Sequence, residues 1–247
     1  MRFIDKFLLN IRRHETPFYF TLYRVLKNIV KFEVPVIPSL HKIMYLEWNI
    51  RVSFYRWLTM KLYYEPLFKS QCVSVGKRFS MSKGSAQGMP CLVGKLFIEI
   101  GDHVALHSVS TFSGGKVHEQ PSLIIGSNTY LGSQLNISVA QTVMIGHNCY
   151  IADRVTIRDN DGHPKNFMKR RANKPVTKED VKPVTIANDV WIGSNATILK
   201  GVTIGNRAIV ASGSLVTKDV PDDSIAAGNP ARIIRLLDEA YFKQTKE

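Results

Sequence analysis

Residues 186–221 read IANDVW-IGSNAT-ILKGVT-IGNRAI-VASGSL-VTKDVP, which are six consecutive six-residue units without a gap. An aliphatic residue opens every unit, and a second small or aliphatic residue stands two places before each opener. A period of six fits neither a single helix nor a long strand. It is typical of a hexapeptide solenoid, in which short strands joined by turns form stacked coils. We therefore expect the openers to point inward and fill a prism.

The same phase continues upstream and predicts a β-helix of five to six coils. Fifteen apolar openers define five coils of three units: Ile100, Leu106, Phe112, Ile125, Leu131, Ile137, Ile145, Ile151, Ile157, Ile186, Ile192, Ile198, Ile204, Val210 and Val216. Val75 and Met81 keep this spacing and indicate a fraying sixth coil. The second residue of a unit is often glycine, which suits a place where the backbone turns tightly and a side chain would collide.

Composition limits the class and the compartment. The chain has 247 residues, a net charge of +13 and 45% apolar residues, which is enough for a large core. The positive charge favours an anionic partner such as a phosphorylated ligand, a nucleic acid or a membrane surface. Cys72, Cys91 and Cys149 show no disulfide or metal spacing, which favours a reducing compartment. With neither a signal-peptide core nor a long apolar run, a cytoplasmic protein is expected.

Residues 1–71 precede the hexads and are expected to form a helical, basic region. Residues 18–32 and 40–64 have helical apolar patterns, and the second is expected to stop before Pro66. Residues 1–70 contain 12 lysines and arginines against 5 acidic residues, a net charge of +7. Two alternatives stay open. The helices pack on the solenoid or in a subunit interface, or their basic, Trp-bearing faces contact the inner face of a membrane.

The β-helix domain is expected to span residues 72–221, with an extruded loop at 158–183. Between residues 163 and 182 this loop carries seven lysines and arginines and two acidic residues, a net charge of +5. Solenoids tolerate insertions at their corners, and function tends to gather there. The last segment is the tail at 222–247, and its latter part looks like a helix that closes the open edge of the prism.

Four motifs carry a family resemblance: DGHP at 161–164, NDVWIGSNATILKGVTIG at 188–205, SGSLVTKDVP at 212–221 and AGNPARIIR at 227–235. Through them, residues 125–235 resemble the hexapeptide-repeat acyltransferases of the maltose and galactoside O-acetyltransferase branch. The resemblance covers roughly half of the chain. It implies a left-handed β-helix, a homotrimer, and acetyl-CoA bound between neighbouring subunits as the co-substrate.

His163 is the candidate catalytic base. It stands at the root of the long loop, and acyl transfer from a thioester to a hydroxyl needs a base with the near-neutral pKa of an imidazole. The resemblance places the catalytic histidine of the family at this position. Asp161 is the candidate that orients the imidazole, with Asp159 and Asn160 close by. The sequence shows no GxSxG-like motif and no activated-cysteine signature, so direct transfer without an acyl-enzyme is expected.

The resemblance also supplies candidate binding residues. The family's contacts with coenzyme A (CoA) fall on Ser194, Ser212, Thr217, Lys218, Arg232 and Arg235, the last two in the CoA-contacting tail at 222–247. The cations among them suit the CoA phosphates. Trp191 is expected to line the CoA groove.

Candidate acceptor contacts are Gln134, Asn136 and Asn160. An acceptor-binding asparagine of the family aligns with Gln134, and an acceptor-binding aspartate aligns with Ala140. A free galactoside or maltose is therefore not the expected acceptor. The basic loop, which includes Lys169, Arg170 and Arg171, suits an anionic or lipid-linked glycan of capsule or O-antigen synthesis.

O-acetylation of a sugar has several rival functions. N-acetylation of a nucleotide-linked amino sugar is the main enzymatic alternative, and a non-enzymatic scaffold is the alternative from another class. A zinc carbonic anhydrase needs three converging histidines, but His103, His107, His118 and His147 do not fit the spacing of that family, so no metal is expected. No nucleic-acid-binding motif accompanies the positive charge, so no nucleic acid partner is expected.

Overall fold

The computed structural model describes residues 3–13, 16–31, 33–82, 88–107 and 109–238. The chain divides into two compact units, Met1–Ser53 and Phe54–Glu247. None of the helices among the described residues is both long and apolar enough to cross a bilayer.

The N-terminal unit is helical, as the sequence predicted. It contains α1 (Phe3–Arg13), α2 (Pro17–Val30) and the beginning of α3 (Pro38–Thr59). The side chain of Thr16 caps α2 by accepting a hydrogen bond from the Tyr19 N–H at 3.4 Å. Pro17 follows in the first turn, where its missing N–H costs nothing. No residue of α2 or α3 is buried, so the apolar side chains of these helices are largely exposed.

The prediction that the second helix stops before Pro66 is wrong. The helix continues from α3 through the π-helical turn η1 (Met60–Tyr64) into α4 (Glu65–Lys69). The Glu65 N–H bonds to the Met60 carbonyl, and this wider turn brings Pro66 into the first turn of α4. A proline there removes no helical hydrogen bond. Phe68 is then fully buried and stacks on Phe79, with 5.8 Å between ring centroids.

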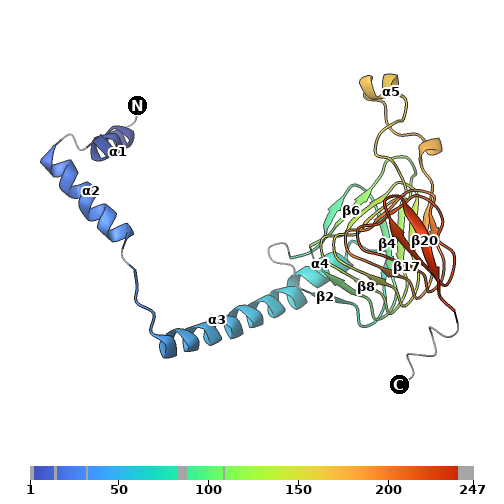
Figure 1. Ribbon diagram of the computed structural model, residues 1–247, viewed down its shortest axis with the longest axis horizontal. Helices are drawn as coiled ribbons and strands as arrows, with labels where there is room; N and C mark the ends of the chain where they lie inside the picture. The colour runs from blue at the N-terminus through green and yellow to red at the C-terminus, as the bar shows by residue number, and fades with distance from the viewer. Residues whose placement is uncertain (1–2, 14–15, 32, 83–87, 108, 239–247) are drawn as a thin grey trace. The chain divides into compact units, whose positions relative to one another are not determined.

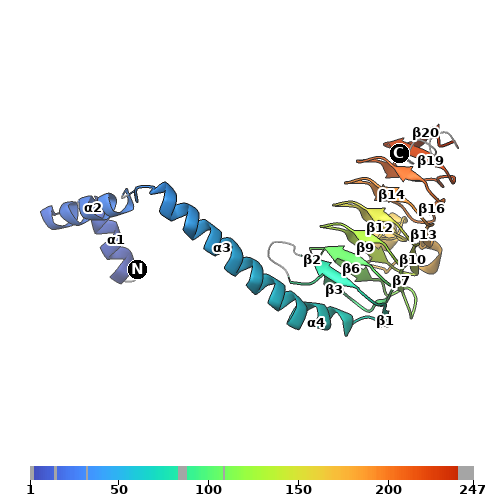
Figure 2. The same ribbon diagram turned by 90° about the horizontal axis from the view of Figure 1, so that it is seen from below.

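From Ser74 onward the chain forms a three-sided prism of short parallel strands (Figures 1 and 2). Sheet A contains β1 (Ser74–Val75), β4 (Phe97–Ile100), β7 (Ser122–Ile125), β10 (Thr142–Ile145), β13 (Val184–Ile186) and β16 (Thr203–Ile204). Sheet B contains β2 (Ser80–Ser82), β5 (Ala105–His107), β8 (Tyr130–Leu131), β11 (Tyr150–Ile151), β14 (Trp191–Ile192), β17 (Ile209–Val210), β19 (Ser224–Gly228) and β20 (Ala231–Leu236). Sheet C contains β3 (Cys91–Val93), β6 (Thr111–Gly114), β9 (Asn136–Val139), β12 (Thr156–Arg158), β15 (Thr197–Ile198) and β18 (Leu215–Val216).

The predicted interior of the prism is confirmed. All fifteen openers are buried, and so are the residues two places before them in the quoted stretch, from Val184 to Ser214. The fraying coil is a full sixth coil, because Val75 pairs with Ile100 and Met81 pairs with Leu106. Its third strand, β3, comes after a longer connection and pairs with β6.

At each corner of the prism, the residue that packs closely against the next coil is not the residue with the left-handed backbone conformation. Glycines directly after the openers face the next coil so closely that a Cβ at Gly193 would lie 2.6 Å from the Ser212 nitrogen. The predicted collision is therefore real, but these glycines do not take the left-handed conformation. That conformation falls two residues later, at positions such as Gln134 (φ 58°) and Asn195 (φ 61°). Polar side chains that tolerate it are favoured there.

Three edges join the sheets: edge AB, edge BC and edge CA, each named for the two sheets that it connects. The loop 158–183 leaves the prism at edge CA, between β12 and β13, and carries α5 (Phe167–Arg171) and the short helix η2 (Lys178–Asp180) (Figure 1). Within residues 224–236 the tail is a β-hairpin, since β19 adds parallel to β17 and β20 pairs antiparallel with β19. The expected C-terminal helix falls mainly on residues 239–247, which lie outside the described residues. The three-part functional division at residues 71 and 221 stays a proposal.

Candidate active site

A buried carboxylate holds the root of the extruded loop. Asp159 comes directly after β12 and is completely buried. Its two oxygens accept hydrogen bonds from the backbone N–H groups of Ala140, Gln141 and Thr142, at 2.7, 2.6 and 2.9 Å. A buried charge of this kind is tolerated because it is fully hydrogen-bonded. Asp159 therefore fixes the turn of the preceding coil beneath the loop and does not face the imidazole.

Asn160 forms the second part of this root. Its amide nitrogen donates to Ser138 Oγ at 3.1 Å and to Asp159 Oδ1 at 2.9 Å, and its amide oxygen accepts from the Gly162 N–H at 3.0 Å. An antiparallel bridge joins Asn160 to Val181, the other limb of the loop. The side chain was predicted to contact the acceptor, and here it holds the two limbs together at the wall of a cavity.

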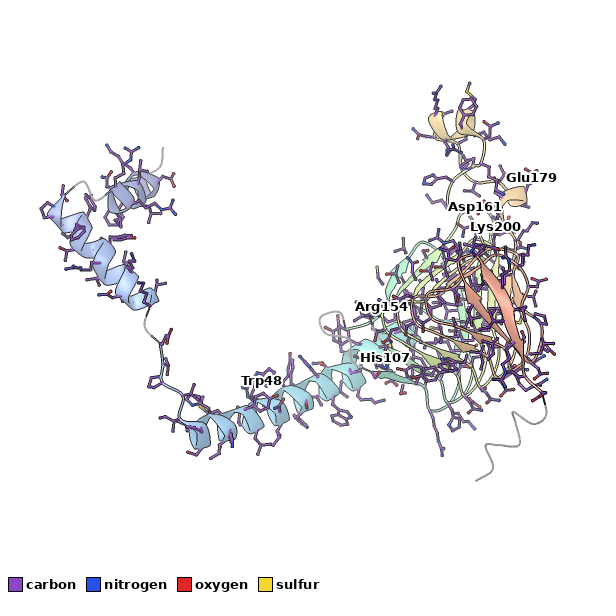
Figure 3. The ribbon with its side chains drawn as sticks, viewed as in Figure 1. Trp48, His107, Arg154, Asp161, Glu179 and Lys200 are labelled. Atoms are coloured by element: carbon purple, nitrogen blue, oxygen red, sulfur yellow. The ribbon has the colours of Figure 1, made fainter. Side chains whose placement is uncertain are left out.

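Asp161 pairs with lysines. Its Oδ2 lies 2.6 Å from Lys200 Nζ and 3.9 Å from Lys165 Nζ. The Lys200 side chain is only 12% exposed and also donates to the Asp180 carbonyl, so it links both limbs of the loop to the coil of β15. Figure 3 labels Asp161, Lys200 and Glu179 at the base of the loop.

His163 stands beyond this anchor, with an exposed side chain, and is followed by the buried Pro164. No described residue of the same chain hydrogen-bonds to its ring, so Asp161 does not orient the imidazole within one subunit. The ring is thus free to meet a substrate or a second chain. Further out, Arg170 Nη1 donates to the carbonyls of Pro164 and Lys165, at 2.9 and 2.6 Å, and folds α5 back on the segment beside His163.

A groove on sheet B gathers three of the candidate CoA residues. Trp191, Ser194 and Ser212 line a hollow of about 280 Å³ together with Tyr130 and Tyr150. The registers of β8, β11 and β14 place the three aromatic residues side by side, one coil apart. The tyrosine rings stack with centroids 4.5 Å apart, and Tyr150 and Trp191 are about half exposed. A stacked apolar wall with hydroxyl groups at one end suits a long, partly polar ligand.

The other candidates lie at four places on the prism. Gln134 occupies a left-handed turn at edge BC, and Asn136 points outward from sheet C. Thr217 and Lys218 follow β18 at edge CA, the edge that also bears His163. Arg232 and Arg235 lie on β20 at the end of sheet B, where both are exposed.

The candidate residues therefore divide between two edges of the prism. The loop with His163 leaves from edge CA, whereas the groove runs along sheet B to edge BC, and the width of sheet C lies between them. Figure 3 shows the separation, with Arg154 of edge BC well away from Asp161 and Lys200.

Sequence reasoning missed Lys200 and the two tyrosines. Tyr130 and Tyr150 each stand directly before an opener, as Trp191 does. Their positions in the hexads could therefore have predicted three outward-pointing aromatic side chains on successive coils. Partial burial raises the pKa of Tyr130, and the neighbouring Tyr150 and Asp153 raise it further. Lys200 gave no such signal, because its partner lies 39 residues away in an irregular loop.

Two of the three thiols are placed unfavourably for nucleophilic catalysis. Burial raises the pKa of Cys72 to about 11, and burial also raises the pKa of Cys149. Among the residues that the structure describes, no three His, Cys, Asp or Glu side chains gather as metal ligands would. Two of the histidines considered for zinc are engaged otherwise: His107 meets the Tyr130 hydroxyl at 3.0 Å, and His147 accepts the Ser127 N–H at 2.9 Å.

Comparison with known proteins agrees with this geometry. Residues 183–218 match the family model described as bacterial transferase hexapeptide (six repeats). The galactoside O-acetyltransferase of Escherichia coli K12 is 37% identical over 160 residues, which cover 63% of this chain and 73% of the relative. The polysialic acid O-acetyltransferase of Escherichia coli O1:K1 is 39% identical over 137 residues, 54% of this chain and 43% of that protein.

A solved structure supports the fold. AntD, an N-acyltransferase from Bacillus cereus, superposes with a TM-score of 0.56 at 19% identity, over 73% of this chain and 92% of that one. The predicted left-handed parallel β-helix with a helical N-terminal region is confirmed. The repeat phase, the DGHP loop and the long match to a galactoside O-acetyltransferase lead to one conclusion: this chain belongs to the hexapeptide-repeat acyltransferases, in the branch of the galactoside and maltose O-acetyltransferases.

Proposed function

We propose that this protein transfers an acetyl group from acetyl-CoA to a hydroxyl of a sugar in a cell-surface polysaccharide or its precursor. The observation that carries the proposal is the placement of His163. Its ring is exposed on a loop whose root is fixed by Asp159 and Lys200, and it stands next to a cavity wall. A base held on a rigid support but open to substrate is what acyl transfer requires.

The chemistry is direct transfer. His163 removes the proton of the sugar hydroxyl as the oxygen attacks the thioester carbonyl, and backbone N–H groups stabilise the oxyanion. The thiolate of CoA leaves as the tetrahedral intermediate collapses and takes the proton back from His163. The raised pKa values of Cys72 and Cys149 are consistent with a route that forms no acyl-enzyme.

The donor site is proposed along the aromatic groove. Trp191, with Tyr130 and Tyr150, would pack against the pantetheine arm, while Ser194 and Ser212 supply hydrogen bonds. Thr217, Lys218, Arg232 and Arg235 are proposed to bind the polar groups and phosphates of CoA.

We propose a homotrimer, and the division of the candidate residues between two edges supports it. One prism keeps His163 at edge CA and the groove at edge BC, on opposite sides of sheet C. If edge CA of one copy meets sheet B of the next, three equivalent sites form around a threefold axis. Each site then takes its base from one subunit and its CoA groove from another.

The N-terminal unit is proposed to contact an anionic membrane surface, where a lipid-linked precursor would be presented. Its helices expose many large apolar side chains, among them Phe18, Ile29 and Tyr45, and residues 1–53 carry nine lysines and arginines against four acidic residues, a net charge of +5. Co-sedimentation with vesicles that contain an anionic phospholipid tests this idea. Equal binding to purely neutral vesicles, or no binding to either kind, contradicts it.

The test of the function is thiol release from acetyl-CoA in the presence of neutral sugars, acidic sugars, amino sugars, nucleotide sugars and polysaccharides. We expect release above background with a hydroxyl acceptor and an alkali-labile acetyl ester in the product. An alkali-stable amide on an amino sugar would replace O-acetylation by N-acetylation. Absence of release with every acceptor, from protein that binds CoA, would favour the scaffold alternative.

A further inference from the structure

A second hollow opens beside His163, and its lining differs from that of the groove. It has a volume of about 600 Å³ and lies at edge CA, between the excursion that follows β6 and both limbs of the extruded loop. Gly162, the residue before His163, forms part of its wall. The size is that of a pocket for a sugar or a similar small group.

The floor of this cavity is neutral and already satisfied. Gly115 lies against Ala140, since a Cβ added to Gly115 would come within 2.9 Å of Ala140 Cα. The N–H of Ala140 is donated to Asp159, and the amide of Asn160 is fully used in the root of the loop. The floor can therefore contact a ligand sterically, but it has no free carboxylate that could accept hydrogen bonds from the hydroxyls of a neutral sugar.

The charged residues in the lining are both lysines. Lys116 comes from the excursion after β6, and Lys178 opens η2 on the far limb of the loop. Neither makes an ion pair within the described residues. The carboxylates of Glu179 and Asp180 in η2 accept hydrogen bonds from the hydroxyl of Thr177, another residue of the lining, at 3.0 and 3.1 Å, and form no ion pair with Lys116 or Lys178. Two ammonium groups thus flank the cavity without a described counter-ion.

Two more basic side chains belong to the segments around edge CA. His118 Nε2, in the same excursion as Lys116, and Arg158 Nε, at the end of β12, are buried without a hydrogen-bond partner among the described residues. Neither residue belongs to the cavity lining itself. Buried polar atoms without partners are rare in folded proteins, and a bound ion is one explanation for them. Both nitrogens carry, or can carry, a proton to donate to an anion.

We infer that this cavity binds a compact anionic group of the acceptor, a carboxylate or a phosphate, between Lys116 and Lys178. The inference rests on the proposed function, because it takes the ligand to be the acceptor whose hydroxyl is delivered to His163. The charge that selects the acceptor is then in the cavity wall and not at the tip of the loop. At the tip, Arg170 is committed to the carbonyls of Pro164 and Lys165, and Arg171 packs over the Phe167 ring.

The test compares matched acceptors on the full chain. The probes are methyl glucuronide against methyl glucoside, methyl galacturonide against methyl galactoside, and galactose 6-phosphate against galactose, with binding followed by saturation-transfer NMR. The carboxylate and phosphate arms separate the two kinds of anion. We expect wild-type protein to prefer the anionic member of at least one pair by about tenfold, a difference of about 1.4 kcal/mol.

The variant Lys116→Gln/Lys178→Gln should remove that preference and leave the weak binding of the neutral sugars unchanged. Lys116→Arg/Lys178→Arg should keep it. The control Lys77→Gln/Lys174→Gln removes the same charge from lysines outside the cavity lining and should change neither. No preference in the wild type, a preference that survives in the Gln variant, or an equal loss in the control each overturns the inference.

Thiol release, measured in parallel, separates this inference from the proposed function. If the anionic sugars bind through the two lysines but no acetyl group is transferred, the cavity assignment is supported and the proposed function is wrong. Acetyl transfer with equal efficiency to neutral and anionic members, unaffected by the Gln variant, leaves the function standing and removes the cavity assignment.

Discussion

At the scale of single residues, the proposed chemistry depends on the imidazole of His163, which is exposed. We expect His163→Ala to lower turnover by about 10²–10⁴, the usual cost of losing a general base. Binding of CoA, measured by calorimetry, should stay near the wild-type value, because the proposed CoA contacts are other side chains that the substitution leaves in place. The variant should also keep its melting temperature, since the side chain is exposed. A variant with half of the wild-type turnover would remove His163 from the mechanism.

Lys200 is expected to act as a positioning residue for the loop. Lys200→Met keeps most of the volume but leaves Asp161 and the Asp180 carbonyl without their shared donor. A base displaced by about 1 Å can lose up to about 10² in rate, so we expect kcat to fall at least tenfold while KM for acetyl-CoA is unchanged. Lys200→Arg should be faster than Lys200→Met, because its guanidinium can still donate to Asp161. If Lys200 only filled space, the two variants would be equally slow.

The matched control is Lys165→Met. Lys165 approaches the same carboxylate oxygen at 3.9 Å but is 74% exposed, and such surface pairs contribute little. Faster proteolysis within residues 161–180 should accompany Lys200→Met and not Lys165→Met. Equal effects of the two substitutions would contradict the role of Lys200.

At the scale of the strand and its turn, the sequence predicted the fold well because each hexad carries its own information. An inward opener, a close-packed second residue and a left-handed turn residue repeat locally, so no long-range contact was needed to find the coils. The loop 158–183 could not be predicted in the same way. Its shape depends on contacts between Asp159, Asn160 and Lys200 and residues of other coils, and no period links them.

The aromatic column of sheet B provides a prediction for an element. We expect Trp191→Ala to raise the Kd for CoA about tenfold, or about 1.4 kcal/mol, because the groove loses half-exposed apolar surface beside Ser194 and Ser212. Tyr150→Ala should act in the same direction, because it removes the ring that stacks on Tyr130. The control Val93→Ala removes an equally exposed apolar side chain on the first coil and should leave Kd unchanged. A Kd for the Trp191 variant within twofold of wild type would place CoA elsewhere.

At the scale of the whole molecule, the sequence supplied the site residues but not their grouping. The family motifs assign His163 and Ser212 to one site, whereas within a single prism the width of sheet C lies between them. The order of strands around the prism reveals this separation, and the proposed homotrimer would bring the two halves together. The family resemblance implied a site between neighbouring subunits, but the residues alone did not show which edge of the prism bears each half.

Subunit complementation tests this arrangement. One partner carries His163→Ala, which removes the base, and the other carries Ser194→Asp/Ser212→Asp, which places negative charge in the CoA groove. Each is expected to be inactive alone. If every site lies between neighbouring subunits, unfolding and refolding the two together in equal amounts should restore about a quarter of the sites, because each copy is intact at one of its two edges. If every site lies within one chain, no mixture regains activity, since every chain lacks one half. Light scattering of the refolded mixture must also show trimers, and recovered activity in a monomer would contradict the shared site.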